Sequence, residues 1–217
     1  MNKSEMKWFD RLIYAIAKVV VAIGIAILHP LRIVGKEHFP QKQPFIVIAN
    51  HLSMWDVFFI ARMMFPARTI FMGKEELFAN PFARWAVGVG GGYPVKRGTA
   101  DISAIKKALK ALKEGHVFCI FPEGTRNRKQ DGTLQKFFNG IGYIALTSGA
   151  QVVPVYFPDN GFKAFRRVRV LVGPPVPLQD LQGTKVTGDS TEQATNRVLN
   201  ALHELRESSI TAEVAQA

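Results

Sequence analysis

The strongest constraint on the fold of this chain is the alternation of short β-rich runs with helical stretches after Pro30. A pattern of this kind is typical of an α/β domain, because strands that run parallel need a long connection, usually a helix, between them. We therefore expect a largely parallel β-sheet flanked by helices. The expected strands are Leu31–Val34, Phe45–Ala49, Thr69–Met72, Val117–Phe121, Val152–Phe157 and Val168–Val172. The expected helices are Asp56–Phe65, Pro81–Val89, Asp101–Glu114, Phe138–Ser148 and Thr191–Arg206.

The 217 residues suit one large domain or two small ones, with enough chain to bury a core. We expect an N-terminal membrane-associated helix over residues 1–30, a main domain over 31–208 and a flexible tail over 209–217. The Pro-rich segment Gly173–Pro177 is the one plausible linker within the main domain.

The N-terminal stretch from Leu12 to Leu28 is apolar except for Lys18, and it follows basic and aromatic residues. It is marginal for a transmembrane helix, which needs about twenty apolar residues, so a helix that lies in one leaflet remains an equal alternative. A signal peptide fits less well, because His29-Pro30 follows without a cleavage pattern. Packing on the domain's own core is a further alternative. The basic and aromatic residues that flank this apolar stretch favour membrane association, which we expect at the cytoplasmic face.

The formal net charge of +11 is concentrated in the middle of the chain, where residues 61–130 hold thirteen basic and five acidic residues. Nucleic-acid binding is not expected, since neither a terminal Lys/Arg run nor a reading motif accompanies the charge. Lys106, Lys107, Lys110 and Lys113 fit the solvated face of an amphipathic helix. The single cysteine excludes an internal disulfide and a Cys-based metal site.

The strand Phe45–Ala49 is followed by the sequence Asn-His-Leu-Ser-Met-Trp-Asp, which contains His51 and Asp56. On an unbroken helix these two side chains would lie about 140° apart, so a contact requires a turn after His51. A junction between strand and helix supplies such a turn. If they meet, the carboxylate fixes the tautomer of the imidazole and raises the basicity of its other nitrogen, which can then accept a proton from a hydroxyl.

Two further clusters of polar residues lie later in the chain. The strand Val117–Phe121 ends in Pro-Glu-Gly-Thr-Arg, so two strands deliver polar groups at their carboxyl ends, where sites form in such sheets. An Arg beside a Gly can hold a phosphate, although a surface turn with an incidental ion pair is the simpler alternative. The third cluster, Gly-Gly-Tyr-Pro-Val-Lys-Arg at 91–97, lacks the ending of a P-loop.

The order of these segments resembles the four motifs of the glycerolipid acyltransferase family, and within it the 1-acyl-sn-glycerol-3-phosphate acyltransferases. The resemblance runs from about residue 31 to residue 177. Its motifs are Asn-His-x-x-x-x-Asp at 50–56, Gly-Gly-Tyr-Pro-Val-Lys-Arg at 91–97, Phe-Pro-Glu-Gly-Thr-Arg at 121–126 and Val-Val-Pro-Val-Tyr at 152–156. The segment at 137–140 departs from the pattern of many members, so no substrate contact is assigned there.

The resemblance implies transfer of a fatty acyl group from an acyl thioester to the sn-2 hydroxyl of lysophosphatidic acid, which gives phosphatidic acid. It implies His51 as general base with Asp56 as its partner. It also implies acceptor binding by Glu123, Gly124, Thr125 and Arg126, with Arg97 as a second phosphate ligand. No Gly-x-Ser-x-Gly elbow is present and Cys119 fits a buried structural thiol, so no covalent acyl-enzyme is expected.

No cofactor is expected beyond the co-substrate, acyl-CoA or acyl-carrier protein, and the scattered histidines show no metal-ligand spacing. The expected partners are lysophosphatidic acid, the acyl donor and an anionic membrane surface. Two alternatives stay open. The acceptor could be another lysophospholipid or glycerol 3-phosphate, or the chain could be a non-catalytic peripheral protein that binds anionic lipid.

Overall fold

The computed structural model describes most of the chain after residue 26. The described residues are 23–24, 27–53, 55–81, 84, 87–88, 91–95, 102–123, 140–158, 165–182 and 185–214. The N-terminal helix expected over residues 1–30 therefore lies largely outside them. None of the helices in these ranges is long and apolar enough to cross a membrane.

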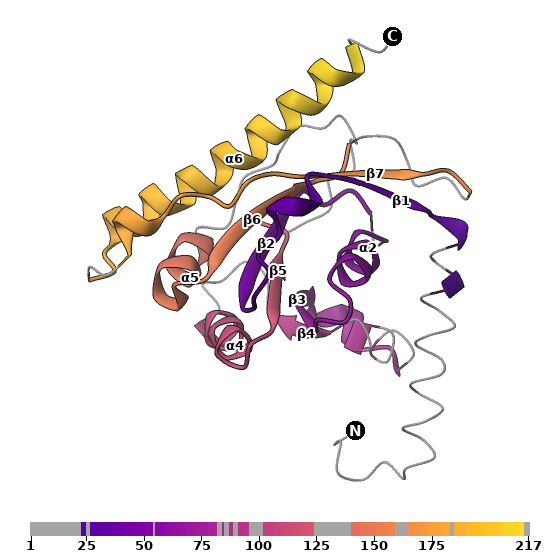
Figure 1. Ribbon diagram of the computed structural model, residues 1–217. Helices are drawn as coiled ribbons and strands as arrows, with labels where there is room; N and C mark the ends of the chain where they lie inside the picture. The colour runs from indigo at the N-terminus through magenta and orange to yellow at the C-terminus, as the bar shows by residue number, and fades with distance from the viewer. Residues whose placement is uncertain are drawn as a thin grey trace.

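A seven-stranded sheet forms the centre of the fold (Figure 1). Its order is β1-β7-β6-β2-β5-β3-β4, and every neighbouring pair is parallel except β6 and β7. The strands are β1 (Leu31–Val34), β2 (Phe45–Ala49), β3 (Thr69–Lys74), β4 (Gly92–Val95), β5 (Val117–Ile120), β6 (Gln151–Tyr156) and β7 (Val168–Val172). The largely parallel sheet predicted from the sequence is confirmed.

One strand was not predicted. β4 reads Gly-Tyr-Pro-Val, and both Gly92 and Pro94 are poor strand formers. It pairs with β3 alone, so it is an edge strand, where a proline that cannot donate to a second neighbour is tolerated. Its formation depends on the partner strand rather than on its own residues.

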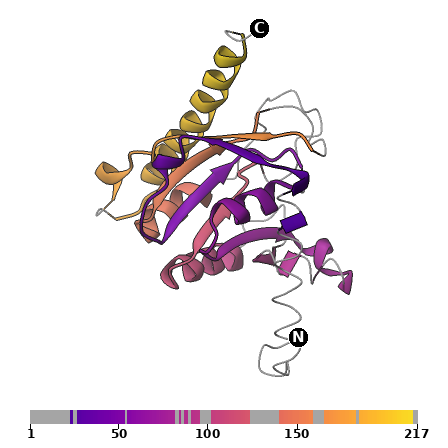
Figure 2. The ribbon, with the colours of Figure 1, turned by 45° about the vertical axis from the view of Figure 1, so that its right-hand side comes forward.

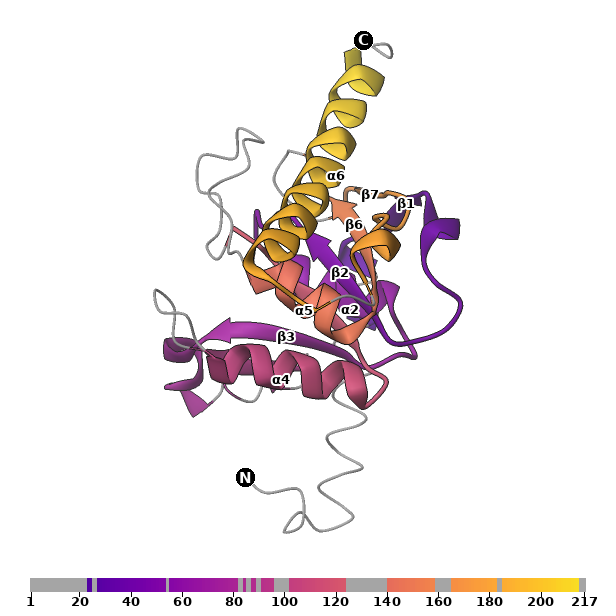
Figure 3. The ribbon, with the colours of Figure 1, turned by 90° about the vertical axis from the view of Figure 1, so that its left-hand side faces the viewer.

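Helices cover both faces of the sheet. They are α2 (Trp55–Met63), α4 (Ile102–Lys113), α5 (Gly140–Ser148) and α6 (Gly188–Val214), with short 3-10 helices at Lys36–His38, Glu75–Phe78 and Gln179–Leu181. Figures 1 and 3 show α4, α5 and α6 on one face, whereas α2 lies on the other. Of the helix expected over 81–89, residues 81, 84, 87 and 88 are described, and all four are helical.

Alternation along the strands divides the apolar residues between two cores. Ile46 and Ile48 of β2 pack with Phe118 of β5 in the core beneath α4, α5 and α6. Val47 and Cys119 face the other way, into the core beneath α2. All five residues of β2 are buried, as expected of a central strand covered on both faces.

Two boundaries differ from those expected. Helix α6 continues to Val214 and buries Ser209, although a flexible tail was predicted from residue 209 (Figure 2). The segment predicted as a linker is part of the domain, because the N–H groups of Gly173 and Val176 donate to carbonyls of β6 at 2.9 and 2.8 Å. Val176 is also buried, so this Pro-rich segment packs on the domain along β6 and does not separate two units.

The contact between α5 and α6 depends on Gly142. A Cβ atom at this position would lie 2.2 Å from the backbone oxygen of Thr191 and 2.5 Å from Oγ1 of Thr195, both on α6. Only a residue without a side chain allows the two helices to approach this closely.

We expect Gly142→Ala to lower the free energy of unfolding by about 1–3 kcal/mol, because α6 must move to relieve the overlap. Urea denaturation followed by circular dichroism measures this change. Tyr143→Ala on the same helix is the control, since Tyr143 is exposed and its loss should change stability little. Equal stability of the Gly142→Ala variant and the wild type would contradict the assigned packing.

Candidate active site

A turn between β2 and α2 brings His51 and Asp56 together. β2 ends at Ala49 and α2 begins at Trp55, so the intervening chain is not helical. Asp56 lies in the first turn of α2, and its Oδ2 accepts the N–H groups of Leu52 and Ser53 at 2.8 and 2.9 Å. A carboxylate is favoured at this end of a helix, where backbone N–H groups lack partners within the helix. The turn is therefore closed by the same side chain that the imidazole contacts.

The expected contact is present. Nδ1 of His51 lies 2.8 Å from Oδ2 of Asp56, and the Asp56 side chain is fully buried. Because a carboxylate accepts hydrogen bonds, this contact assigns the proton to Nδ1 and leaves the lone pair on Nε2. The His51 side chain is 12% exposed, and its ring stacks on Phe121 with 4.2 Å between centroids. The described residues provide no hydrogen-bond partner for Nε2.

Glu123 connects the first and third motifs. Its Oε1 accepts the backbone N–H of His51 at 3.0 Å, and only 5% of the residue is exposed. The two residues lie just beyond the ends of β2 and β5, which are neighbours in the sheet. Glu123 was predicted to bind the acceptor. The structure adds a contact that positions the backbone of His51, whereas its role toward a substrate stays a prediction.

Asn50 fixes the other side of the same loop. Its side-chain nitrogen donates to the carbonyl of Phe157 at 2.9 Å, and its side-chain oxygen accepts the N–H of Phe157 at 2.8 Å. Asn50 is buried and Phe157 follows β6, so the pair joins β2 to its neighbour on the other side. Sequence reasoning identified Asn50 as part of a motif but assigned it no role. The sequence feature that could have indicated this role is an amide side chain directly after a buried strand.

The remaining predicted residues lie outside the described part of the chain. Arg97 follows β4, which is described to Val95, and Gly124, Thr125 and Arg126 follow Glu123. Phe121 belongs to the motif at 121–126 but received no role from the sequence, and its ring stacks on the imidazole of His51. Its signal was an aromatic residue at the end of a strand next to a polar cluster. Within the described ranges, no group of three or more His, Cys, Asp or Glu residues could hold a metal ion.

Cys119 lies close enough to the dyad for the charge of Asp56 to affect it. Burial raises the pKa of the Cys119 thiol well above its usual range, and the nearby Asp56 carboxylate raises it further. The reactive form of cysteine is the thiolate, so this thiol is held in its unreactive form. Its role is to pack in the core beneath α2, as the sequence predicted.

The fold and this site agree with comparisons to known proteins. A family model described as Acyltransferase matches residues 30–158, which is more than half of the chain. The chain therefore belongs to the acyltransferase family, and this confirms the class of enzyme that the four motifs predict.

Individual relatives extend the comparison beyond the family. The 1-acyl-sn-glycerol-3-phosphate acyltransferase of Streptococcus pneumoniae is 26% identical over 210 residues, which cover 91% of this chain and 75% of the relative. The protein of the same name from Saccharomyces cerevisiae is 27% identical over 208 residues, which cover 90% of this chain and 65% of that relative. The crystal structure of the LPA acyltransferase PlsC from Thermotoga maritima is similar with a TM-score of 0.60 and 26% identity, over 88% of this chain and 82% of that one.

We expect Cys119→Ala to retain acyl transfer near the wild-type rate, because the thiol is protonated and packs in the core. Loss of the buried sulfur should lower the free energy of unfolding by about 1–2 kcal/mol. Turnover of an acyl thioester measures the first effect and urea denaturation the second. An acyl group found on Cys119 by mass spectrometry, or turnover abolished in this variant, would contradict the assignment.

Proposed function

We propose that the protein transfers a fatty acyl group from an acyl thioester to the sn-2 hydroxyl of 1-acyl-sn-glycerol 3-phosphate, which gives phosphatidic acid for phospholipid synthesis. The names of the relatives from S. pneumoniae and S. cerevisiae support this reaction. The observation that carries the proposal is the His51–Asp56 contact at 2.8 Å, because it leaves the lone pair of the imidazole on Nε2, where it can accept a proton from an acceptor hydroxyl.

The proposed mechanism is a direct transfer. Nε2 of His51 removes the proton from the acceptor hydroxyl as its oxygen attacks the thioester carbonyl. Collapse of the tetrahedral intermediate breaks the carbon–sulfur bond, and the departing sulfur takes the proton from the imidazolium. Asp56 stabilises the positive charge that His51 carries between these steps, through the hydrogen bond to Nδ1. Both substrates must be bound at once, since no acyl-enzyme separates two half-reactions.

The geometry of the base depends on Glu123 and Asn50. Glu123 holds the backbone of His51, and the side chain of Asn50 bonds to the backbone of Phe157, just after β6. Positioning of this kind contributes to rate, because a misplaced reacting group loses much of the advantage of proximity. The buried carboxylate of Glu123 therefore positions His51, in addition to its predicted role in binding the acceptor.

Arg126 and Arg97 are the proposed phosphate ligands, on the basis of the family resemblance, with Gly124 and Thr125 beside them. A guanidinium binds a phosphate through two parallel hydrogen bonds. The acyl donor is acyl-CoA or acyl-carrier protein, and the protein requires no further cofactor. We place the reaction at an anionic membrane surface on the cytoplasmic side.

Two substitutions test the base. We expect His51→Ala to abolish acyl transfer and Asp56→Asn to lower kcat by about 10²–10⁴, because the amide carries no charge to stabilise the imidazolium. Steady-state kinetics with a purified lysophosphatidic acid measures both effects, and thermal unfolding verifies the fold. Ser53→Ala is the control in the same turn, since among the described residues its hydroxyl accepts a hydrogen bond only from the N–H of Trp55, at 3.3 Å. Near-normal turnover by His51→Ala would disprove the assignment.

The acceptor and its phosphate contact are tested together. With one acyl donor and a panel of lysophosphatidic acid, other lysophospholipids and glycerol 3-phosphate, we expect lysophosphatidic acid to have the highest kcat/KM. Arg126→Ala should raise its KM about 10–100-fold with little change in kcat or in the KM of the donor, because a charged ground-state contact is lost. A purely kcat effect would argue against phosphate binding, and preference for another acceptor would replace the substrate proposed here.

A further inference from the structure

The β1–β7 ribbon, formed by residues 31–34 and 165–172, extends past the edge of the sheet where the candidate active site lies (Figures 1 and 2). β7 runs antiparallel to β6, and their last pair is Tyr156 with Leu171. The start of β7 therefore lies about 10 Å beyond the end of β6, at a rise of about 3.3 Å per residue. β1 is parallel to β7, so both strands begin on the same side of the sheet as His51.

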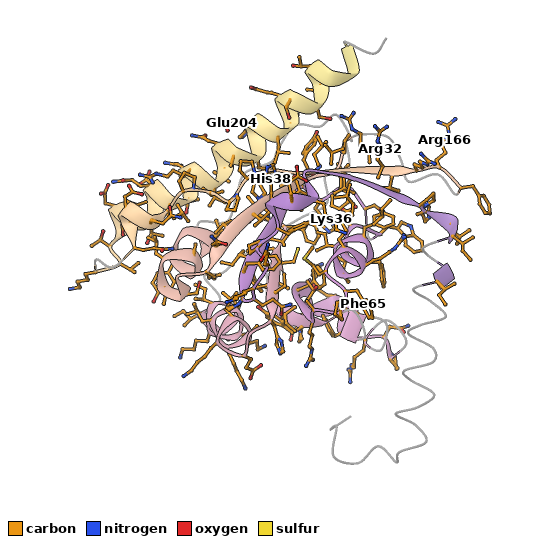
Figure 4. The ribbon with its side chains drawn as sticks, in the orientation of Figure 1. Arg32, Lys36, His38, Phe65, Arg166 and Glu204 are labelled. Carbon is orange, nitrogen blue, oxygen red and sulfur yellow. The ribbon has the colours of Figure 1, made fainter. Side chains whose placement is uncertain are left out.

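The beginning of this ribbon is densely cationic. Arg32 of β1 is the register partner of Arg169 of β7, so their side chains leave the same face of the ribbon. Arg166 and Arg167 come just before β7 and are exposed, as is Arg32. Figure 4 shows Arg32 and Arg166 pointing away from α2, on the upper side of the ribbon. Arg32, Arg166 and Arg167 form no ion pair with any described residue, so their charge is uncompensated within that part of the chain.

An aromatic side chain stands beside these cations. Phe165 is 74% exposed, and its backbone has a φ of 64°, a conformation that bulky residues rarely adopt. Its N–H donates to the carbonyl of Leu28 at 2.6 Å, which ties the ribbon to the chain that comes from the apolar N-terminal stretch. Ile27 and Leu28 are exposed as well. Exposed apolar residues and arginines thus gather at one end of the molecule.

We propose that the arginine tip, defined as Arg32, Phe165, Arg166 and Arg167, binds the headgroups of an anionic phospholipid bilayer. The guanidinium groups contact lipid phosphates, and the ring of Phe165 lies in the interface among the headgroups. Because the tip projects beyond the active-site edge, this contact turns that edge toward the bilayer. Only one part of the proposal rests on the proposed function: this orientation would let the site receive a lipid acceptor from the membrane.

A bilayer fits these features better than an acidic protein partner. The tip is continuous with the apolar residues at 27–28, and a membrane accommodates both the cations and the exposed apolar groups. An acidic protein surface would complement the arginines but would leave Phe165 and Ile27 against charged groups.

Vesicle sedimentation with the full-length chain tests the proposal. We expect the double variant Arg166→Glu and Arg167→Glu to bind vesicles that contain phosphatidylglycerol at least about tenfold more weakly than the wild type, with little change on pure phosphatidylcholine. The matched control reverses Lys106 and Lys113, two exposed residues of α4, and changes the net charge by the same amount. Phe165→Asn, which tolerates the positive φ, should weaken binding to both kinds of vesicle.

Spin labelling is a second measurement, and it reports on the tip even if the N-terminal stretch provides most of the binding to vesicles. The buried Cys119 makes it possible. As the single native cysteine, with a raised pKa, it should not react with a thiol label in the folded protein. A nitroxide placed through Arg167→Cys should become shielded from a water-soluble relaxing agent when phosphatidylglycerol vesicles are added. A nitroxide placed through Lys113→Cys should remain accessible.

The proposal is overturned if the label at position 167 remains accessible on vesicles, or if reversal of the α4 lysines weakens binding as much as reversal at the tip. It is also overturned if the tip variant binds vesicles normally and the label responds only to an acyl-carrier protein, which would make the tip a protein-docking surface. Neither readout requires turnover. An inactive His51→Ala variant should bind vesicles like the wild type, so failure of the proposed function is distinguished from failure of this inference.

Discussion

The candidate active site depends on one buried carboxylate. Oδ2 of Asp56 accepts three N–H groups, from His51, Leu52 and Ser53, within a fully buried environment. Burial of a charge is costly unless hydrogen bonds replace the lost water, and these three donors provide that compensation. Its Oδ1 has no hydrogen-bond partner among the described residues, so the compensation is one-sided and concentrated on the oxygen that contacts the imidazole. Closing the turn and orienting the base are therefore the same interaction.

Sheet order determines which groups can reach this carboxylate. β2 lies between β6 and β5, and each of the three strands is followed by a residue that fixes the loop: Asn50 after β2, Phe157 after β6 and Glu123 after β5. Parallel pairing brings the carboxyl ends of the three strands to one edge. The antiparallel pairing of β7 then reverses the direction of the ribbon, so the starts of β1 and β7 reach the same edge. One reversal in the sheet thus places the arginine tip on the same side of the sheet as His51 and Asp56.

Much of this arrangement could be predicted from local patterns. Leu31–Val34, Phe45–Ala49 and Val168–Val172 form strands with the expected bounds, because runs of β-branched and apolar residues favour strands. The contact of His51 with Asp56 was predicted from the family resemblance, whereas the spacing alone made it depend on a turn after His51. Strand β4 could not be predicted from local patterns, because its residues favour turns and its pairing with β3 decides its conformation. The linker predicted at Gly173–Pro177 failed for a similar reason, as prolines can border a sheet edge as well as separate domains.

The position of charged residues in the fold could not be predicted by counting charges along the sequence. The whole segment from 131 to 217 is neutral, with eight residues of each sign, and so gave no sign of a cationic site. Folding separates these charges. It brings Arg166, Arg167 and Arg169 alongside Arg32, which lies more than a hundred residues earlier, while acidic residues such as Glu192, Glu204 and Glu207 lie on α6. A field at a membrane surface acts over about 10 Å, so it responds to this local arrangement and not to the total. In the proposed direct transfer the base acts only when donor and lipid acceptor are bound together, so under our proposal the position of these charges determines how the site is oriented toward a membrane.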